Sequence, residues 1–366
     1  MVLVGLLVAF ACRAQAFGAG QPGARRAGHP AAWRFVSIPD FLNADVAYPE
    51  PNWDQAVDYV LGAIKAEDPD FVVVPGDLVL GRWSRSQEDV AKKAAVYYPA
   101  WVKRMQDHSL KFYAALGDHE LGDNPWRGKK RELVPHYEEA FRKHLRMPRN
   151  GPEHMQGLAY SVRHKNLLML VLDVFEQDAH GDVHMDVAAE QLAWVQRTLR
   201  GAAGIGHIVV AGHVPILPER PGQQPGRELS LERGAESDIW RVLAEHAVDL
   251  YLCGHRHTTR ICRKDDVHQI IHGSAPAKQS SFSYLLVTVF PDRLELEVKR
   301  IGTVLAGDKG GAYKYANRIV RITEKARARG FRSVGRMTIR KHVGGKSFEY
   351  HDGVFRDRFD NLDGAR

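Results

Sequence analysis

The chain has 366 residues, of which 44% are hydrophobic and 26% are charged, an ordinary balance for a globular protein. Its formal net charge of +7 resides in residues 313–366, which hold 14 basic and 6 acidic residues, against 37 and 38 in the rest of the chain. This distribution argues against a nucleic-acid-binding basic surface on residues 1–312. It leaves two interpretations of the basic tail: contact with an anionic partner, or simple solvation.

The beginning of the chain reads as an export signal. Val2–Phe10 form an apolar run and Ala14-Gln15-Ala16 offers a small-x-small cleavage site, although no lysine or arginine precedes the run. We therefore predict a signal peptide over residues 1–16 and a secreted or periplasmic protein, with a cytoplasmic protein as the alternative. Residues 17–32 are rich in Gly, Ala, Pro and Arg, which predicts a flexible lead-in. No internal run reaches the ~18 apolar residues that a transmembrane helix needs.

Strands and helices are predicted to alternate from residue 34 onward. Apolar residues from Trp53 to Ile64 follow helical spacing, which predicts a helix with Asn52 as its cap. The all-apolar run Phe71–Val74 is typical of a strand that is buried on both faces. The other elements predicted in this half are strands at Arg34–Pro39 and Lys111–Leu116, a hairpin of Tyr160–Arg163 with Leu167–Leu172, and a helix from its cap Asp186 to Leu199.

The second half continues the alternation and then changes to strands alone. The predicted elements are a strand at His207–Ala211, a helix at Ser237–His246, and strands at Leu250–Cys253, Thr259–Arg263, His268–Ile271, Ser283–Phe290 and Leu294–Lys299. Mixed units followed by a meander predict two packed sheets with helices outside. Farther on, an apolar stripe predicts a helix over Tyr313–Arg329, and Phe331–Tyr350 contains β-like stretches. We divide the chain into a catalytic domain over residues 33–300 and a basic C-terminal extension over residues 301–366.

Five segments place metal-binding residue types directly after a predicted strand. They are Asp40, Gly76-Asp77, Gly117-Asp118-His119-Glu120, Gly212-His213 and Gly254-His255-Arg256-His257. Taken alone, a Gly-Asp pair is often a turn. A lone histidine after an apolar strand is more often a buried side chain with its own hydrogen bonds than a metal ligand. Taken together they predict a dinuclear metal centre, because carboxylate oxygen and imidazole nitrogen suit Zn, Mn or Fe. Sites in such sheets also form beyond the carboxyl ends of strands.

The order of these motifs resembles the calcineurin-like metallophosphoesterase family, which includes purple acid phosphatases and DNA-repair nucleases. That family reads D-x-H, G-D, G-N-H-D/E, a lone H and G-H-x-H, and the resemblance runs from about Phe35 to about Arg300. It implies a four-layer α/β/β/α sandwich with two mixed β-sheets. The chain departs from the family at two positions: Leu42 stands where histidine is usual, and Asp118 stands where asparagine is usual.

The resemblance implies a role for each matching residue. The implied ligands are Asp40, Asp77 and His257 for the first divalent transition-metal ion, and Asp77, Asp118, His213 and His255 for the second. His119 is expected to donate a proton to the leaving oxygen, and Glu120 to orient His119 by accepting its second N–H. Because Leu42 cannot coordinate a metal, we expect Asn43, Asp45 or water to complete the ligand set of the first ion.

The implied activity is metal-dependent hydrolysis of phosphate esters with a metal-bound hydroxide as the nucleophile. Two alternatives remain open: a phosphodiesterase or nuclease of the same family, and a degenerate member that binds metal without turnover. The segments 78–110 and 119–158 follow metal motifs directly and are expected to build the substrate pocket. Their candidate residues, each of which also suits an ordinary solvated loop, are Arg82, Trp83, Arg85, Trp126, Arg127 and Arg131.

Overall fold

The computed structural model describes residues 32–41, 51–81, 83, 86–226, 228–273, 281–306 and 319–363. The predicted signal peptide over residues 1–16 lies outside this part, and so does nearly all of the predicted lead-in. Leu42, Asn43 and Asp45, on which the first metal motif depends, also lie outside it. Among the described helices, none combines the length and the apolar composition that crossing a membrane requires.

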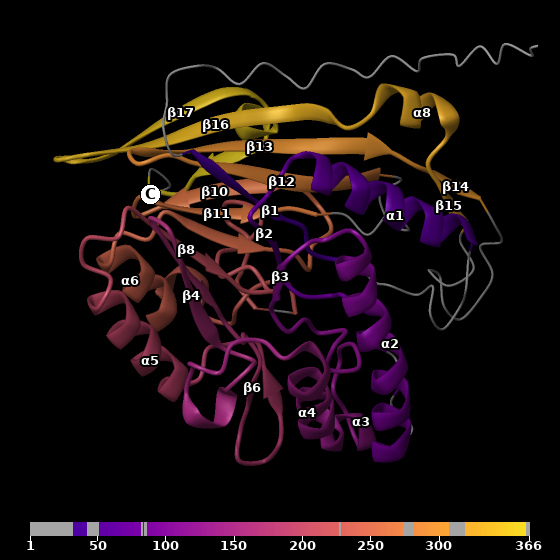
Figure 1. The fold of residues 1–366 in the computed structure, drawn as a ribbon. Coiled ribbons are helices and arrows are strands. Elements are labelled where there is room, and N and C mark those ends of the chain that lie inside the picture. The colour runs from indigo at the N-terminus through magenta and orange to yellow at the C-terminus, as the bar shows by residue number, and fades with distance from the viewer. Residues whose placement is uncertain are drawn as a thin grey trace, which may run out of the picture. The chain divides into compact units, whose positions relative to one another are not determined.

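Two seven-stranded sheets pack against each other, and each mixes parallel and antiparallel pairs (Figure 1). The first sheet has the order β17 (Gly345–Gly353), β16 (Arg332–His342), β13 (Arg293–Gly302), β12 (Ser281–Val289), β1 (Trp33–Ser37), β2 (Phe71–Val74) and β3 (Phe112–Ala114). The second has the order β18 (Phe359–Asn361), β10 (Arg260–Lys264), β11 (Val267–Ile271), β9 (Leu250–Cys253), β8 (His207–Ala211), β5 (Leu167–Val171) and β4 (Tyr160–His164). Two short ribbons pair β6 (Glu176–Gln177) with β7 (Val183–His184) and β14 (Val304–Ala306) with β15 (Ile319–Arg321).

Helices cover the outside of the two sheets. They are α1 (Pro51–Ala66), α2 (Gln87–Asp107), α3 (Lys129–Glu132), α4 (Val134–Leu145), α5 (Ala189–Arg200), α6 (Asp238–Glu245), α8 (Glu324–Arg329) and α9 (Val354–Asp357), with short 3₁₀ turns η1 (Glu153–Met155) and η2 (Gly234–Glu236). Helix α2 packs on α4, and α5 packs on α6. In Figure 1, α5 and α6 lie beside the second sheet. The predicted four-layer α/β/β/α sandwich is confirmed.

The strands at the centre of the sheets are buried along their whole length. Every residue of β2, β5, β8, β9 and β11 is buried. This burial explains the unbroken apolar runs of β2, β5 and β9. Trp33 of β1 connects the sheets, because its indole N–H donates to Oδ1 of Asn166 beside β5 at 2.9 Å. Strands β2, β8 and β9 begin and end at the predicted residues.

Three local predictions are wrong. Asn52 lies inside α1, and Ala188 rather than Asp186 occupies the N-cap of α5, because Asp186 instead accepts a hydrogen bond from the backbone of Val187. The helix predicted over Tyr313–Arg329 is interrupted: β15 is a strand, and α8 begins only after Thr323, whose hydroxyl accepts from Ala326 N. Residues 313–318 lie outside the described part.

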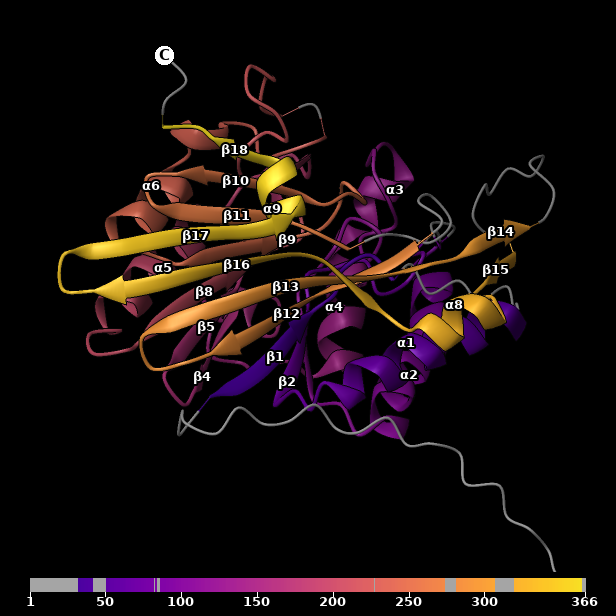
Figure 2. The ribbon, with the colours of Figure 1, turned by 90° about the horizontal axis from the view of Figure 1, so that it is seen from above.

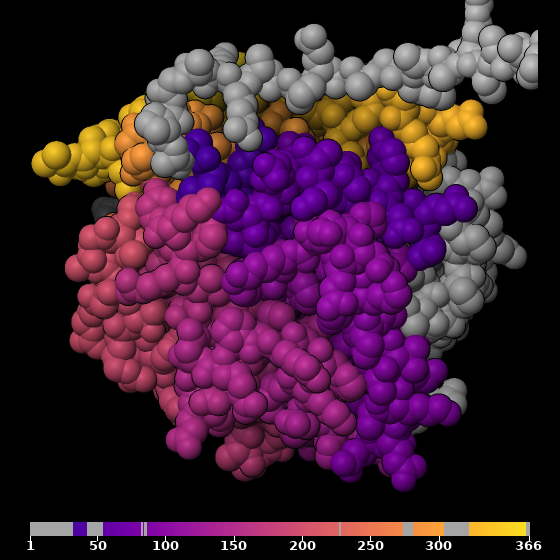
Figure 3. Space-filling view, viewed as in Figure 1, coloured from indigo at the N-terminus to yellow at the C-terminus, as the bar shows by residue number. Residues whose placement is uncertain are grey.

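The C-terminal residues are built into both sheets. Strands β16 and β17 extend the first sheet beyond β13, and β18 pairs with β10 in the second (Figure 2). Lys341 of β16 lies 2.7 Å, and Lys346 of β17 3.3 Å, from the buried carboxylate of Asp249 beside β9. Part of the basic charge therefore neutralises a carboxylate inside the fold. Val343, which lies between β16 and β17, is exposed. The β16–β17 hairpin projects as the yellow atoms at the left of Figure 3.

Candidate metal centre

The two sheets supply different kinds of ligand to one place. Asp40, Asp77 and Asp118 follow β1, β2 and β3, which are neighbouring parallel strands of the first sheet. His213 follows β8, and His255 and His257 follow β9, in the parallel part of the second sheet. Because parallel strands end at the same edge, each sheet gathers its own ligand type there. The six predicted ligands therefore converge from segments that lie as far apart in the sequence as Asp40 and His257.

The side chains of these residues lie within coordination range of shared points. Nε2 of His213 lies 2.8 Å from Oδ1 of Asp118 and 3.3 Å from Oδ1 of Asp77. Nδ1 of His255 lies 3.1 Å from the same Asp118 oxygen. The structure thereby forms one candidate ligand group of Asp118, His213 and His255 and another of Asp40, Asp77 and His213.

His257 joins the second group through Asp40. Its Nε2 lies 3.5 Å from Oδ1 of Asp40, and both side chains are almost fully buried. The other Asp40 oxygen, Oδ2, is buried and accepts no hydrogen bond from the described residues. A buried carboxylate oxygen without a donor is costly, and a cation at this point would remove that cost.

The tautomer of His213 provides the sharpest test of whether these residues fit a metal. Its Nδ1 lies 2.8 Å from the carbonyl oxygen of Pro75. A carbonyl can only accept, so Nδ1 carries a hydrogen, and Nε2, the ring nitrogen left for a metal ion, faces the carboxylates. His255 is held in the same manner, with Nε2 at 2.8 Å from the carbonyl oxygen of Glu228 and Nδ1 facing Asp118. In neutral imidazoles, lone pairs facing carboxylate oxygens repel unless a cation lies between them, so the donor set fits a divalent ion.

Charges in the site confirm that it needs a positive partner. Burial raises the pKa of Asp77 well above its usual value, and the carboxylates of Asp118 and Asp40 add to this effect against the charge of His213. Burial alone would lower the pKa of His213, but Asp77 and Asp118 raise it well above the usual value. Three carboxylates this close cannot all remain ionised without cations among them.

Four of the six ligands have strained backbones. Asp40, Asp77, His255 and His257 adopt left-handed conformations with φ of 60°, 59°, 64° and 49°. This region is unfavourable for residues other than glycine and costs on the order of 1 kcal/mol each. Such strain persists where the surrounding structure fixes it, and it commonly marks a functional site. Gly117 shows how tight the packing is, because a Cβ there would lie 2.4 Å from the backbone N of Asp77.

His119 faces the centre from the loop after β3. Its Nδ1 lies 2.6 Å from the carbonyl oxygen of Leu80, and its Nε2 lies 4.0 Å from Oδ2 of Asp77 and 3.7 Å from Oδ1 of Asp123. Nε2 therefore points toward the metal-binding carboxylates. Geometry alone also groups His119 with Asp118 and Asp123, so metal binding by His119 is the competing assignment.

Glu120 does not orient His119, and that prediction is wrong. Its Oε2 accepts from the backbone N of Asp77 at 2.8 Å and of Gly117 at 2.9 Å, and its Oε1 accepts from Val79 N at 3.0 Å. The fully buried carboxylate is thus occupied by three amides, while Leu80 holds the histidine ring. Glu120 instead fixes the backbones that carry Asp77 and Asp118.

Other residues singled out in the sequence occupy different places. Oδ1 of Asp173 accepts from the backbone N of Phe175 at 3.0 Å, so it positions Phe175, whose ring lies 6.3 Å from that of His213. Trp83 is buried in the core, and Arg131 pairs with Asp182. Trp126 and Arg127 line a pocket, whereas Arg82 and Arg85 lie outside the described residues.

Comparison with known proteins agrees with this geometry. The sequence matches the calcineurin-like phosphoesterase family over residues 44–259. The chain belongs to this family. Family membership and the paired ligand groups together support a dinuclear metal centre. A search of curated proteins finds no significant match.

Solved structures share the fold at low sequence identity. A dimetal phosphatase from Danio rerio is 15% identical with a TM-score of 0.53, and the match covers 73% of this chain and 95% of that one. A purple acid phosphatase from yellow lupin (Lupinus luteus) seeds is 14% identical with a TM-score of 0.50, and the match covers 74% of this chain and 51% of that one. At these identities the likeness establishes the fold of this family member and leaves its substrate to be found.

Proposed function

We propose that this protein hydrolyses phosphate esters with two divalent transition-metal ions bound between the sheets. The observation that carries the proposal is the environment of His213, whose Nε2 faces Asp118 and Asp77 while Pro75 holds its Nδ1. Ions held there would supply a nucleophile derived from water and would stabilise charge on the phosphoryl oxygens. Zn, Mn and Fe all suit these oxygen and nitrogen donors.

The side chains divide the remaining work. Asp77 has one carboxylate oxygen 3.3 Å from Nε2 of His213, the residue that the two ligand groups share, and the other 4.0 Å from Nε2 of His119. Leu80 fixes the ring of His119 so that Nε2 faces the centre; when the ring is an imidazolium, with a hydrogen on both nitrogens, Nε2 can give a proton to the leaving oxygen. Glu120 fixes the two loops that carry Asp77 and Asp118 relative to each other, because it accepts hydrogen bonds from the backbone of both.

The alternatives are a phosphodiesterase or nuclease and a member without turnover. The balanced charge of residues 1–312 does not favour binding along a nucleic-acid strand. A binding protein without turnover has no need of a proton donor, and His119 is held in place for that task. We therefore favour hydrolysis of small phosphate esters.

A substrate panel combined with metal analysis tests the proposal. The purified protein is freed of metal with a chelator, reloaded with Zn, Mn or Fe, and assayed on matched phosphomonoesters and phosphodiesters. We expect hydrolysis to disappear with the metal and to return with it. His213→Asn should lose metal and activity, whereas His154→Asn, which changes an exposed histidine paired with Glu190, should lose neither. Hydrolysis that survives complete metal removal would contradict the proposal.

A further inference from the structure

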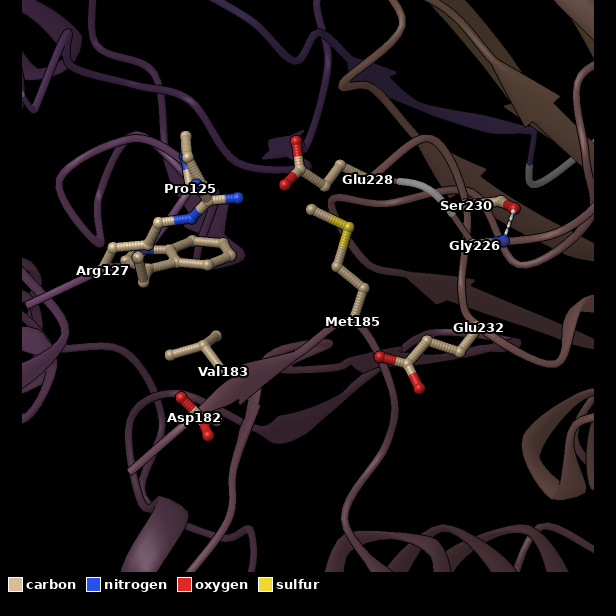
Figure 4. Close-up of a pocket in the computed structure, with 10 residues that line it drawn as sticks. Pro125, Arg127, Asp182, Val183, Met185, Gly226, Glu228, Ser230 and Glu232 are labelled. Atoms are coloured by element: carbon tan, nitrogen blue, oxygen red, sulfur yellow. Dashed lines mark hydrogen bonds between the residues drawn. The ribbon is translucent and has the colours of Figure 1, made fainter. Parts of the chain in front are cut away.

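A pocket of about 320 Å³ opens between three segments near the metal centre (Figure 4). The segments are the loop after β3, the β6–β7 ribbon and the loop that precedes η2. We call it the side pocket and define it by Trp126, Arg127, Val183, Met185, Glu228 and Glu232. Its volume falls in the range of pockets that take a small organic group.

Two walls of the side pocket connect to predicted metal ligands, one through Phe175 and the other directly. On one wall, the ring of Trp126 lies 5.6 Å from that of Phe175, which in turn packs against His213. On the other wall, the carbonyl oxygen of Glu228 lies 2.8 Å from Nε2 of His255. The side pocket therefore adjoins the ligand group of Asp118, His213 and His255.

The indole ring of Trp126 gives the pocket a flat apolar surface of fixed orientation. The indole N–H of Trp126 donates to the carbonyl oxygen of Leu121 at 2.9 Å, which sets the orientation of the ring. Val183 and Met185 continue this apolar surface. A fixed indole face that is partly open to solvent offers stacking to a planar group.

The rim of the pocket is polar. Asp182 is paired with Arg131, and Glu232 lies 3.1 Å from Nδ1 of His184, so these carboxylates already have partners. Within the described part of the chain, Glu228 and Arg127 form no ion pair. Figure 4 shows them on opposite sides of the pocket, with the carboxylate and the guanidinium directed toward it. One acceptor and one donor thus remain for a ligand.

We propose that the side pocket binds the leaving group of the substrate, and that this group is a planar ring with both hydrogen-bond donors and acceptors, as in a nucleoside. The inference rests on the proposed function and names its substrate class. The ring would stack on Trp126, donate to Glu228 and accept from Arg127. An alkyl chain would leave both polar groups unpaired, and a second phosphate would meet the carboxylate of Glu228 beside the guanidinium of Arg127.

The test compares two substrates with the same reacting group. Adenosine 5′-monophosphate and glycerol 3-phosphate are both primary alkyl phosphomonoesters. A general loss of catalytic activity lowers kcat/KM for both substrates alike, so the ratio of the two values measures the contribution of the pocket to recognition of adenosine. We expect Trp126→Leu to lower this ratio roughly 5- to 100-fold, the range for a lost stacking contact. Trp126→Phe should restore most of it. Trp194→Leu, which removes an indole on α5 outside the pocket, should leave the ratio unchanged.

Binding of adenosine alone separates this inference from the proposed function. Calorimetric titration of the metal-loaded protein should show adenosine binding that Trp126→Leu and Glu228→Gln both weaken. If no phosphoester is hydrolysed but adenosine binds in this manner, the proposed function fails and the pocket assignment stands. A substrate ratio that Trp126→Leu does not change would overturn the pocket assignment. A loss confined to Arg127→Gln would overturn the choice of a planar ring and indicate an anionic group.

Discussion

The Nδ1 atom of His119 lies 2.6 Å from the carbonyl oxygen of Leu80. A backbone carbonyl in the loop after β2 therefore sets the tautomer and the direction of this side chain. The approach is so close that a Cβ on Gly81, which has φ of +67°, would lie 1.4 Å from the carbonyl oxygen of His119. The glycine lets the two loops meet, and their meeting aims Nε2 at the metal-binding carboxylates.

Replacing His119 by alanine should lower turnover and keep both metal ions. Loss of a proton donor costs roughly two to four orders of magnitude in kcat. The loss should be smaller for aryl phosphates with acidic leaving groups, because these depart with little protonation. Steady-state kinetics on a series of leaving groups, together with metal analysis of the variant, measures both effects.

The competing assignment of His119 gives the opposite pattern. If His119 binds metal with Asp118 and Asp123, the variant will lose an ion and slow all leaving groups alike. His136→Ala, which removes a histidine of α4 outside the ligand groups, serves as the control and should keep metal and turnover.

Replacing Glu120 by glutamine should destabilise the protein. A glutamine has one carbonyl oxygen for the three backbone amides that the carboxylate now accepts, and its NH₂ would face an amide donor. We expect a loss of roughly 2–4 kcal/mol in the free energy of unfolding, because buried amides would be left unpaired. Urea unfolding of the metal-free protein measures it, with exposed Glu139→Gln as the control. If Glu120→Gln leaves the free energy of unfolding unchanged but alters how kcat depends on the leaving group, Glu120 acts in catalysis and its structural assignment is wrong.

Replacing Asp118 by asparagine tests the departure from the family pattern. The Asp118 carboxylate contacts both His213 and His255, so its extra charge should favour the ion held by this group. In calorimetric metal titrations the wild type should show two unequal affinities, and the variant should weaken the tighter one at least roughly tenfold. Exposed Asp107→Asn should leave both unchanged. If the variant lowers only the weaker of the two metal affinities, the ligand group that contains Asp118 is the weaker site and our assignment is reversed.

The sequence predicted the centre because its signal is local. Each ligand directly follows an apolar run, and the runs of β2, β8 and β9 are buried throughout, so their boundaries and the ends that carry Asp77, His213 and His255 could be predicted. The rule that sites form beyond the carboxyl ends of strands then implied that these ends lie together, and the resemblance to the family assigned a role to each ligand. The six ligands that the motifs indicated all meet in the structure.

Contacts made by the backbone escaped prediction, because the sequence does not show which carbonyl or amide approaches a side chain. The bond from His119 to Leu80 and the three amides on Glu120 depend on how two loops cross, and the motif order says nothing of this. The same holds for β16 and β17, which were predicted as β-like stretches of a basic tail, with an anionic partner or simple solvation as the two interpretations of its charge. Their lysines instead reach Asp249, more than ninety residues earlier in the chain, as the pairs with Lys341 and Lys346 show.

Asp249 should contribute to stability in a pH-dependent manner. Burial alone would raise the pKa of its carboxyl, but His207, Lys346 and Lys341 outweigh burial and lower the pKa from 3.8 to about 2. A carboxyl whose pKa is lower in the folded state stabilises the protein above the unfolded pKa, and this stabilisation is lost as pH falls through the folded value. The shift corresponds to about 2 kcal/mol, present above about pH 5 and lost toward pH 2.

Asp249→Asn should therefore lower the free energy of unfolding by about 3 kcal/mol at pH 7, because two lysines lose a buried partner. The difference from wild type should shrink as pH falls from 5 toward 2, since only the wild type protonates this group on unfolding. Urea unfolding at a series of pH values measures the difference, and exposed Asp107→Asn should show almost none at any pH. A difference that stays constant down to pH 2.5 would mean that the charge on Asp249 does not hold β16 and β17 against the second sheet.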